Sequence, residues 1–302
     1  MFPKLTIICW LICTFHIGHS QTTYVQFSSQ EEQHHFLRWE KDRIPLISAH
    51  RGGIYAEYPE NSLEAFEHTF NQHFAIIEFD VSMTVDSVLV LMHDRTVDRT
   101  TTGSGVLGAM TFNEVRKLRL KRTDGTPTNS PIPTFTEALI WLKNKTIATV
   151  DIKKGVPVDR LVKEIRATKA EKNVVVITYS AEQAAEVYRI APDLMISVIL
   201  RNEDELQRHL QLGIPANRMV AFTGVTLLSP AWYERLHQLN ILCILGTMGN
   251  IDNSAKAKGD QVYRNLIESG VDILSTDRPV EAGQAIKQLI PLKSTKHQYF
   301  RK

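Results

Sequence analysis

The chain has 302 residues, of which 43% are hydrophobic and 23% charged, an ordinary composition for a soluble globular protein that excludes collagen-like, low-complexity and disordered classes. A net charge of +2 argues against a dedicated nucleic-acid-binding protein, and three cysteines are too few for a disulfide framework. We therefore expect one large domain or two small ones.

The N-terminal residues have the pattern of a secretory signal peptide. A short basic start is followed by an apolar run from Leu5 to Phe15, and the small residues Gly18 and Ser20 precede the expected cleavage site. The run is too short to span a bilayer, which needs about 20 apolar residues. We expect cleavage after Ser20 and export to a periplasmic or extracellular location, with no stable membrane anchor afterwards. An uncleaved anchor is the alternative. Cleavage would leave Cys243 as the single cysteine, and its apolar neighbours indicate a buried, unreactive thiol.

The rest of the chain alternates short apolar runs with amphipathic segments. Near-continuous β-branched runs are typical of parallel strands that are covered by helices. Eight such runs occur: Leu46–Ala49, Ala75–Val81, Thr146–Ile152, Asn173–Tyr179, Met195–Leu200, Met219–Thr223, Ile241–Leu245 and Asp272–Ser275.

Helical spacing of apolar residues marks most of the segments between these runs. The expected helices are Asn61–Asn71, Val158–Thr168, Ala181–Ile190, Glu203–Leu212, Pro230–Leu239, Gln261–Glu268 and Val280–Leu289. The alternation predicts an α/β protein, either a TIM-type (β/α)8 barrel or a doubly wound sheet. A length near the roughly 250 residues of a typical barrel favours the barrel. So does the lack of a G-x-G-x-x-G motif after the first strand.

One segment interrupts the alternation. The run Val88–Met92 follows Ala75–Val81 without room for a crossover helix, so the two runs are expected to form an antiparallel β-hairpin. A two-residue turn would place Asp80 opposite Leu91 and bring His93 beside the carboxylates of the parent strand. A register shifted by one residue would still keep His93 within reach of this strand.

Residues 94–133, which follow the hairpin, are rich in Thr, Gly, Ser and Pro and are expected to form a small inserted cap. The predicted organisation is a signal peptide over residues 1–20, an N-terminal extension with a helix over 21–44, the barrel over 45–291 and a C-terminal tail over 292–302. The sequence carries no signal for a particular oligomeric state.

Charged side chains gather at the carboxyl ends of the predicted strands, where the active sites of TIM barrels lie. Glu78 and Asp80 lie two residues apart, on one face of their strand, and Asp151 lies on the next parallel strand. Three converging carboxylates repel one another unless a cation neutralises them, and oxygen ligands suit Mg²⁺ or Ca²⁺. The alternative is that they form ion pairs with Arg51 and Lys153 alone.

Two histidines, His50 and His93, stand at the ends of neighbouring predicted strands. They are either zinc ligands or a general acid and a general base on the two sides of a reacting centre. Arg51 and Lys153 supply fixed positive charge for an oxyanion, most naturally a phosphate. Together these residues predict metal-assisted phosphoryl chemistry. The sequence has no P-loop motif, which would indicate NTP hydrolysis, and no G-x-S-x-G motif, which would indicate a serine nucleophile.

Three further polar residues are weighed for structural roles. Asn61 is expected either to cap the first barrel helix, with Glu64 as its capping-box partner, or to take part in the site. Asp277 is expected to cap the helix that begins near Pro279. Glu60 is left open as a contact for a ligand.

These residues fall within a series of motifs that resembles the glycerophosphodiester phosphodiesterase family. The similarity extends over about residues 45–289 and is carried, in order, by His50-Arg51-Gly52, Pro59-Glu60-Asn61-Ser62, Glu78-Phe79-Asp80, His93-Asp94, Arg99-Thr100-Thr101 with Gly103 and Gly105, Pro131-x-Pro133-Thr134-Phe135, Asp151-x-Lys153 and Ser275-Thr276-Asp277-Arg278-Pro279.

The resemblance implies a TIM-type barrel with an inserted cap and a small-molecule substrate, a glycerophosphodiester that is hydrolysed to glycerol phosphate and an alcohol. It implies that one divalent metal ion binds Glu78, Asp80 and Asp151. It also implies an acid/base pair of His50 and His93, and phosphate contacts from Arg51 and Lys153.

The chain departs from the family pattern at two places in the expected site. The family usually has Glu at the position of Asp151, and an aromatic residue near Gly246. The first departure shortens one metal ligand by a methylene group, and the second widens the pocket. A lipid-cleaving phosphodiesterase of the lysophospholipase D type is therefore kept as an alternative. A catalytically silent protein that binds phosphorylated ligands is kept as another.

Overall fold

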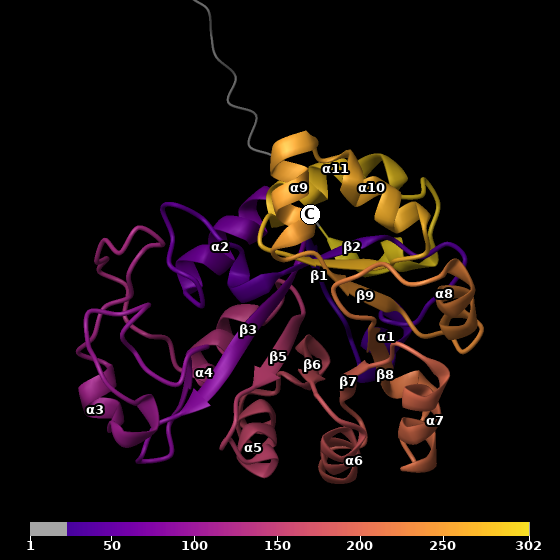
Figure 1. Ribbon diagram of the computed structural model, residues 1–302. Helices are drawn as coiled ribbons and strands as arrows, with labels where there is room; N and C mark the ends of the chain where they lie inside the picture. Colours follow the sequence, from indigo (N-terminus) through magenta and orange to yellow (C-terminus); the bar gives the residue numbers. More distant parts are fainter. Residues whose placement is uncertain (1–22, 302) are drawn as a thin grey trace, which may run out of the picture.

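The computed structural model describes residues 23–301, and a closed barrel of parallel strands lies at its centre (Figure 1). Each strand pairs with its neighbours in chain order, and the pairing of the first strand with both the second and the last closes the barrel. The strands are β2 (Leu46–Ala49), β3 (Ile76–Met83), β5 (Ala148–Ile152), β6 (Val174–Ile177), β7 (Met195–Ile199), β8 (Met219–Phe222), β9 (Cys243–Gly246) and β10 (Ile273–Thr276). All eight match predicted runs, so the TIM-type barrel is confirmed and the doubly wound sheet is excluded.

Helices surround the barrel (Figure 1). They are α2 (Leu63–Gln72), α4 (Phe135–Leu142), α5 (Val158–Thr168), α6 (Ala181–Ile190), α7 (Glu203–Gln211), α8 (Pro230–His237), α9 (Asn250–Lys258), α10 (Gln261–Glu268) and α11 (Pro279–Ile286). The periodicity did not predict α4 and α9. Short 3₁₀ turns connect several elements: η1 (His50–Gly52), η3 (Glu171–Asn173), η4 (Ala216–Arg218), η5 (Lys287–Leu289) and η6 (Thr295–Tyr299).

Helix α5 shows how local sequence determines these elements. Its buried residues Leu161, Val162 and Ile165 recur at helical spacing and pack into the main core, while charged residues cover the outer face. The helix ends at Lys169, which adopts a left-handed conformation with φ 54°, and its backbone N–H bonds back to the last turn. The apolar face therefore orients the helix, and this cap turns the chain toward β6.

The hairpin is present, but its register differs from the prediction by one residue. Strand β4 (Leu89–Leu91) pairs antiparallel with the end of β3, and Val81 lies opposite Leu91, so the predicted pairing of Asp80 with Leu91 was wrong. The connecting loop has three residues, Val85–Ser87, and the last of them has φ 62°. A three-residue loop that ends in a left-handed residue is a common hairpin form, and its extra residue shifts the pairing.

The segment after the hairpin has a small hydrophobic core of its own. It contains η2 (Leu107–Ala109) and α3 (Phe112–Val115), and two antiparallel bridges, Thr96 with Val106 and Thr101 with Leu120, hold its loops together. Figure 1 shows this segment beside the end of β3. Its core residues Val97, Leu107, Val115, Leu120 and Ile132 pack with Val90 of β4 and the adjacent Met92.

Both ends of the described chain lie at the amino end of the barrel. Strand β1 (Tyr24–Val25) pairs antiparallel with β11 (Phe300–Arg301), and α1 (Gln30–Phe36) packs beside them. Their apolar side chains join the first residues of several barrel strands in a second core. The signal peptide expected over residues 1–20 lies outside the described residues and stays a prediction.

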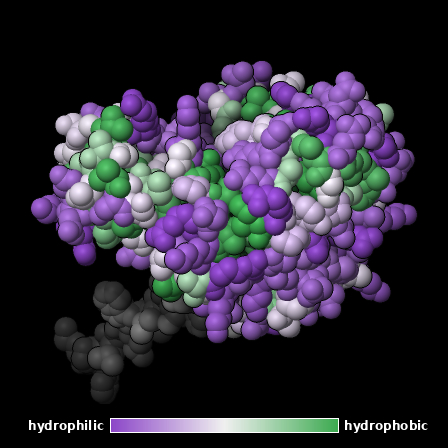
Figure 2. Space-filling view, turned by 90° about the horizontal axis from the view of Figure 1, so that it is seen from below, coloured by the Kyte–Doolittle hydropathy of each residue, from purple (hydrophilic) through white to green (hydrophobic). Residues whose placement is uncertain are grey.

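The surface is mostly hydrophilic. Figure 2 shows one face on which hydrophobic residues gather near the middle, with hydrophilic residues around them. Within residues 23–301, no helix has the length and apolar character that a membrane span requires.

Candidate active site

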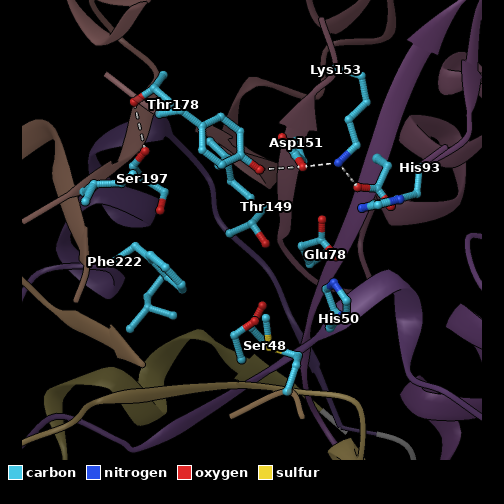
Figure 3. Close-up of a pocket in the computed structure, with 17 residues that line it drawn as sticks. Ser48, His50, Glu78, His93, Thr149, Asp151, Lys153, Thr178, Ser197 and Phe222 are labelled. Atoms are coloured by element: carbon cyan, nitrogen blue, oxygen red, sulfur yellow. Dashed lines mark hydrogen bonds and ion pairs between the residues drawn. The ribbon is translucent and has the colours of Figure 1, made fainter. Parts of the chain in front are cut away.

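A pocket of about 180 Å³ opens within the carboxyl end of the barrel (Figure 3). Charged residues stand on one side of it, and Phe222 lies on the opposite side. Six of the seven candidate residues line this pocket, and the seventh, Arg51, contacts two of them from the adjacent turn η1. The six are His50, Glu78, Asp80, His93, Asp151 and Lys153.

Three carboxylates form the most buried part of the site. Glu78 and Asp80 alternate along β3 and point to one face, and Asp151 on β5 pairs in register with Asp80. One oxygen of each lies within 4.8 Å of the others, and all three residues are buried. Burial, and then repulsion from Asp80, raise the pKa of Glu78 well above its usual range. The site therefore holds more negative charge than the protein groups can stabilise comfortably.

Two cations compensate part of this charge. The Lys153 ammonium lies 2.7 Å from Asp80 Oδ1 and 2.6 Å from Asp151 Oδ2, and Arg51 Nε lies 3.5 Å from Asp80 Oδ2. Burial alone would raise the pKa of Asp80, but the contacts with Lys153, together with the hydrogen bond from Asn61, outweigh burial and lower it. Burial alone would likewise lower the pKa of Lys153, but the Asp80 and Asp151 carboxylates raise it.

These ion pairs are the ones that the alternative interpretation expected, but they do not complete the site. Three carboxylates face two cations, and the buried oxygen Oδ1 of Asp151 has no hydrogen-bond partner in the described part of the chain. Glu78 accepts a hydrogen bond of 2.7 Å from the backbone N–H of Arg51. An excess of buried carboxylate oxygen with an unused acceptor is the donor set that a hard divalent cation prefers, so the residues present fit such an ion.

Each histidine is held by a carboxylate, which comes from a distant segment for His50 and from the adjacent residue for His93. His50 Nδ1 lies 2.7 Å from Asp277 Oδ1, and His93 Nδ1 lies 2.7 Å from Asp94 Oδ1. Because Nδ1 of each ring is engaged, Nε2 is the nitrogen that can exchange a proton with a bound molecule. The zinc alternative would need these nitrogens to converge on one ion, but the carboxylates cluster separately from the imidazoles.

The structural role predicted for Asn61 was wrong. The N-cap of α2 is Ser62, whose hydroxyl accepts from the backbone N–H of Ala65. Asn61 adopts φ 54° and binds Asp80 twice: its amide donates to Oδ2 at 2.7 Å, and its oxygen accepts the backbone N–H of Asp80 at 3.0 Å. The sequence pattern of a cap fitted both neighbours, and only the fold brings Asn61 to β3.

The structure also corrects Asp277. The N-cap of α11 is Arg278, without a capping side chain, and Asp277 instead turns to His50.

Tyr179 was not identified from the sequence as a residue of the site. Its hydroxyl donates to Asp151 Oδ2 at 2.8 Å. Burial, and then Asp151, raise the pKa of this phenol, so it remains a donor at neutral pH. Its position at the carboxyl end of a predicted strand was the signal that could have identified it.

The wall opposite the carboxylates is mostly apolar, although Thr178 and Ser197 also line it. It is built from the ends of the four strands β6 to β9 and the loops that follow them. At Gly246, where the family pattern usually has an aromatic residue nearby, an added Cβ would meet Val225 at 3.0 Å and Phe222 at 3.2 Å. Neighbouring side chains therefore occupy the space that a larger residue would need. The apolar residues that line this wall are Ile177, Ile199, Phe222, Ile244 and Met248.

A second group of potential metal ligands lies at the amino end of the barrel, among the described residues. It consists of His237, Cys243 and Asp272. Both carboxylate oxygens of Asp272 already have partners: Arg43 binds one, and His237 and the backbone N–H of Cys243 bind the other. Burial raises the pKa of the Cys243 thiol, so it stays protonated. The group is a closed structural cluster.

The fold and the first of these two sites define a TIM-barrel enzyme with a pocket suited to a phosphate ester. The model of the glycerophosphoryl diester phosphodiesterase family matches residues 50–281. The chain therefore belongs to this family and is a phosphodiesterase of glycerophosphodiesters.

Individual relatives agree with this assignment. A glycerophosphodiester phosphodiesterase from Caldanaerobacter subterraneus is 29% identical over 241 residues, which cover 78% of this chain and 94% of that protein. Glycerophosphodiester phosphodiesterase 1 from Bos taurus is 43% identical over 102 residues, 33% of this chain and 30% of that protein.

Solved structures support the same fold. A glycerophosphoryl diester phosphodiesterase from Parabacteroides distasonis has a TM-score of 0.85 and 35% identity, and covers 93% of this chain and 99% of that one. A phosphodiesterase from Oleispira antarctica, solved with the product sn-glycerol-3-phosphate, has a TM-score of 0.65 and 17% identity, and covers 81% of this chain and 97% of that one.

Proposed function

We propose that the chain is a metal-dependent, exported enzyme that hydrolyses glycerophosphodiesters to glycerol phosphate and an alcohol by histidine acid/base catalysis. The observation that carries this proposal is the unbalanced carboxylate cluster beside two oriented imidazoles. Its buried Asp151 Oδ1 has no partner within residues 23–301. The sn-glycerol-3-phosphate bound to the Oleispira relative supports a small-molecule phosphate ester as substrate.

In this proposal Glu78, Asp80 and Asp151 hold one Mg²⁺ or Ca²⁺ ion. Both ions bind carboxylate oxygen, and the bound ion supplies charge stabilisation at the phosphoryl oxygens. Arg51 and Lys153 add fixed positive charge for the phosphate. Release of Lys153 from Asp80 and Asp151 when an ion binds would free its ammonium for the substrate.

The histidines move the protons. Water adds across one phosphorus–oxygen ester bond, so one imidazole accepts a proton from the attacking water molecule and the other donates a proton to the leaving alcohol oxygen. Asp277 and Asp94 fix the Nδ1 side of His50 and His93, which leaves Nε2 of each ring for these transfers.

The test is turnover of glycerophosphocholine by the purified protein, with Mg²⁺, with Ca²⁺ and with EDTA, coupled to detection of glycerol-3-phosphate. We expect turnover with at least one ion and none with EDTA. Absence of turnover on every small glycerophosphodiester with either ion would overturn the proposal and favour a silent protein that binds phosphorylated ligands. Undiminished turnover in EDTA would overturn the metal dependence.

The apolar wall supports a second candidate, a lysophospholipase D-type reaction on the same pocket. The sequence offered no apolar channel in the cap, but the ends of β6 to β9 supply apolar surface instead, and beyond them Val225 and Leu227 are exposed. Exposed apolar side chains on the loop that follows β8 suit contact with an acyl chain. A higher kcat/KM for lysophosphatidylcholine than for glycerophosphocholine would favour this candidate, and the reverse order would exclude it.

Export is proposed on the sequence pattern of residues 1–20 alone. Expression of the full chain in an exporting host, followed by N-terminal sequencing of the exported protein, tests it. A mature chain that begins at Gln21 would support cleavage after Ser20. Retention of the full-length chain in the membrane fraction would favour the uncleaved anchor.

A further inference from the structure

Arg99 of the insertion binds two carboxylates beside the active site, Asp94 and Glu60. Its Nε donates to Asp94 Oδ2 at 2.7 Å and its NH2 to Asp94 Oδ1 at 3.0 Å. The same guanidinium binds Glu60 through NH1 at 2.7 Å and NH2 at 2.9 Å. One side chain therefore makes paired hydrogen bonds to two carboxylates that come from different loops, a geometry that only a planar guanidinium provides.

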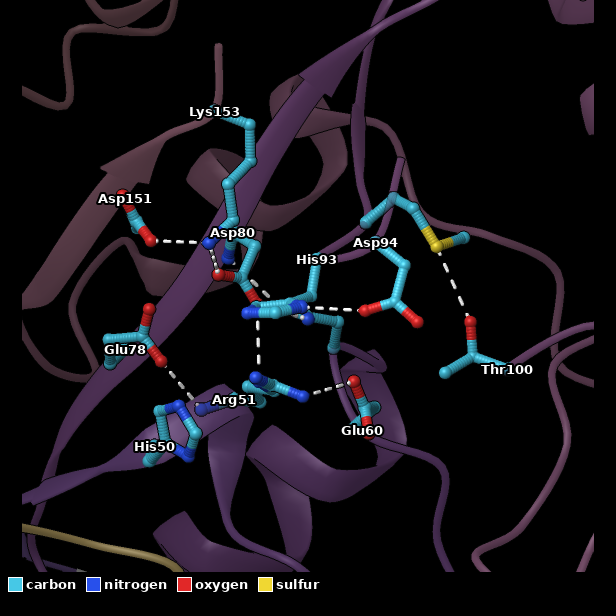
Figure 4. A network of polar contacts seen from close by, with 12 residues as sticks. His50, Arg51, Glu60, Glu78, Asp80, His93, Asp94, Thr100, Asp151 and Lys153 are labelled. Atoms are coloured by element: carbon cyan, nitrogen blue, oxygen red, sulfur yellow. Dashed lines mark hydrogen bonds and ion pairs between the residues drawn. The ribbon is translucent and has the colours of Figure 1, made fainter. Parts of the chain in front are cut away.

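Each of these carboxylates also binds a residue of the proposed reaction centre. Glu60, whose side chain is 10% exposed, accepts from Arg51 NH1 at 2.8 Å. Asp94 Oδ1 accepts from His93 Nδ1 at 2.7 Å. The contacts form one chain, from Arg51 through Glu60, Arg99 and Asp94 to His93. Figure 4 shows its two ends, the contact of Arg51 with Glu60 and that of His93 with Asp94.

The electrostatics of this chain favour its ionised form. Burial alone would raise the pKa of Glu60, but the Arg99 hydrogen bonds and the Arg51 and Arg99 charges lower it. Hydrogen bonds from Arg99 are the main reason that the pKa of Asp94 is lowered far below its usual range. Without Arg99, Glu60 would face one cation instead of two, and the Asp94 carboxylate would keep only its hydrogen bond with His93.

We propose that Arg99 is a positioning residue that fixes both the His93 ring and the Arg51 guanidinium, and so couples the insertion to the reaction centre. This inference rests on the proposed function of His93 and Arg51. It assigns a role to the Arg99-Thr100-Thr101 motif and to Glu60, for which the reaction itself gives none. Antiparallel bridging of Thr101 with Leu120 anchors the segment that carries Arg99 to the core of the insertion.

The two pairs of hydrogen bonds that Arg99 makes predict separable kinetic effects. The pair with Asp94 orients His93, the proton-transfer group, so its loss lowers kcat. The pair with Glu60 orients Arg51, a phosphate contact, so its loss raises KM. We expect Arg99→Ala to lower kcat by about 10- to 100-fold and to raise KM as well, the scale observed when groups that orient reactive residues are lost. Glu60→Gln should raise KM more than it changes kcat.

Arg119 provides a matched control in the same insertion. It is exposed and its NH1 donates to the backbone carbonyl oxygens of Arg116 and Leu118, with no carboxylate partner among the described residues. Arg119→Ala removes an arginine from the insertion without touching the chain of contacts, and we expect kcat and KM within about twofold of the parent protein.

The experiment measures kcat and KM of Arg99→Ala, Arg99→Lys and Arg119→Ala on glycerophosphocholine, with thermal unfolding of each and with added guanidinium chloride at millimolar concentration. Arg99 is 48% exposed, so free guanidinium can enter its place. We expect guanidinium to restore part of the kcat of Arg99→Ala. Arg99→Lys should stay impaired because an ammonium cannot form two paired contacts.

A kcat of Arg99→Ala within twofold of the parent protein would overturn the inference. So would a loss of kcat that guanidinium does not restore and that accompanies a lower unfolding temperature than Arg119→Ala shows, because the role would then be structural. Failure of the proposed function is distinguished by His93→Ala: if that variant stays active, the catalytic assignment fails, whereas an inactive His93→Ala with an unimpaired Arg99→Ala overturns only the inference about Arg99.

Discussion

The two ends of the barrel bury similar side chains and use them differently. At the carboxyl end, Glu78, Asp80 and Asp151 face Lys153 and Arg51, and Asp151 Oδ1 is left without a partner within residues 23–301. At the amino end, a single buried carboxylate, Asp272, binds Arg43, His237 and a backbone N–H, so both of its oxygens are satisfied.

The difference distinguishes a binding site for a cation from a cluster that stabilises the fold. A buried carboxylate with a full set of donors stabilises the fold, and its removal leaves the donors unpaired. A set of buried carboxylates with more charge than its partners neutralise is unfavourable in the protein alone, and becomes favourable when a cation binds. Metal-ligand residue types occur at both ends, so the residue types alone do not separate the two cases.

The largest expected effect is on activity and is confined to the carboxyl end. His50→Ala and His93→Ala should each lower kcat by about 10²- to 10⁴-fold, because each removes one proton-transfer group. The matched variant at the amino end is His237→Gln, which removes an imidazole that binds Asp272 and stacks on Trp39. Its kcat should stay near that of the parent protein at temperatures where it remains folded. The measurement is steady-state turnover of glycerophosphocholine at saturating metal.

Two results would contradict the expectation that only the carboxyl end controls turnover. Near-normal turnover by either alanine variant would show that its ring is not a proton-transfer group. A folded His237→Gln protein with a kcat as low as that of His93→Ala would show that the amino end also controls the chemistry.

The second expected effect is a loss of stability, and it is larger at the amino end of the barrel. Asp272→Asn should lower the free energy of unfolding by about 3 kcal/mol, since it removes the charge that pairs Arg43 in a buried setting. Asp151→Asn, also buried, should change it by less than about 1 kcal/mol in the absence of metal, because the loss of repulsion offsets the loss of the Lys153 contact. Urea unfolding in EDTA measures both.

Equal destabilisation by the two substitutions would remove the distinction between the two clusters. Activity provides the complementary readout: Asp151→Asn should be inactive although stable, and Asp272→Asn should be active although less stable.

Much of the molecule followed from local sequence pattern. The eight barrel strands were predictable because parallel strands that are buried on both faces read as continuous apolar runs. The fold also brings Glu78, Asp80, Asp151 and Lys153 together as their spacing suggested, since residues two apart on a strand share a face and neighbouring parallel strands end at the same edge.

The errors concern residues whose role depends on a distant partner. Asn61 precedes a helix and Asp277 precedes another, so both fit local capping patterns, yet the fold carries them to Asp80 and His50. The hairpin register failed because loop length, not strand pattern, determined it: the left-handed Ser87 adds a third turn residue. Local spacing contains no information about contacts across the barrel.

The third expected effect is stabilisation of the fold by a cation that binds the excess of carboxylates. Addition of Mg²⁺ or Ca²⁺ should stabilise the parent protein, by about 2.7 kcal/mol at a concentration 100 times the dissociation constant. Glu78→Gln reduces the charge of the cluster, so we expect it to lose most of this stabilisation while retaining the fold. Thermal unfolding with and without each ion, monitored without substrate, gives the shift. An equal metal-dependent shift in Glu78→Gln would place the ion somewhere other than this cluster.

The smallest effect tests whether the amino end carries uncompensated charge. His73, which precedes β3, packs half-buried against Gly283 of α11, and its partial burial, followed by the nearby Lys287, lowers its pKa from 6.5 to about 4. The unfolded chain therefore binds a proton near pH 6.5, whereas the folded chain does not until about pH 4, so the free energy of unfolding falls as the pH decreases through this range. The gap sets an upper limit of about 3 kcal/mol, and we expect about 2 kcal/mol because the ring is partly accessible to solvent.

The measurement is urea unfolding of the parent protein and of His73→Gln at intervals between pH 7.5 and pH 4.5. The glutamine carries no charge at any of these values, so the two curves should separate as the pH falls, with the parent protein losing more stability. Other titrating groups contribute to both curves and cancel in the difference. Parallel curves would mean that His73 accepts its proton in the folded state without cost, and that the amino end tolerates a buried charge without a partner. That outcome would contradict the distinction between the two ends, because an uncompensated charge would then no longer mark a binding site.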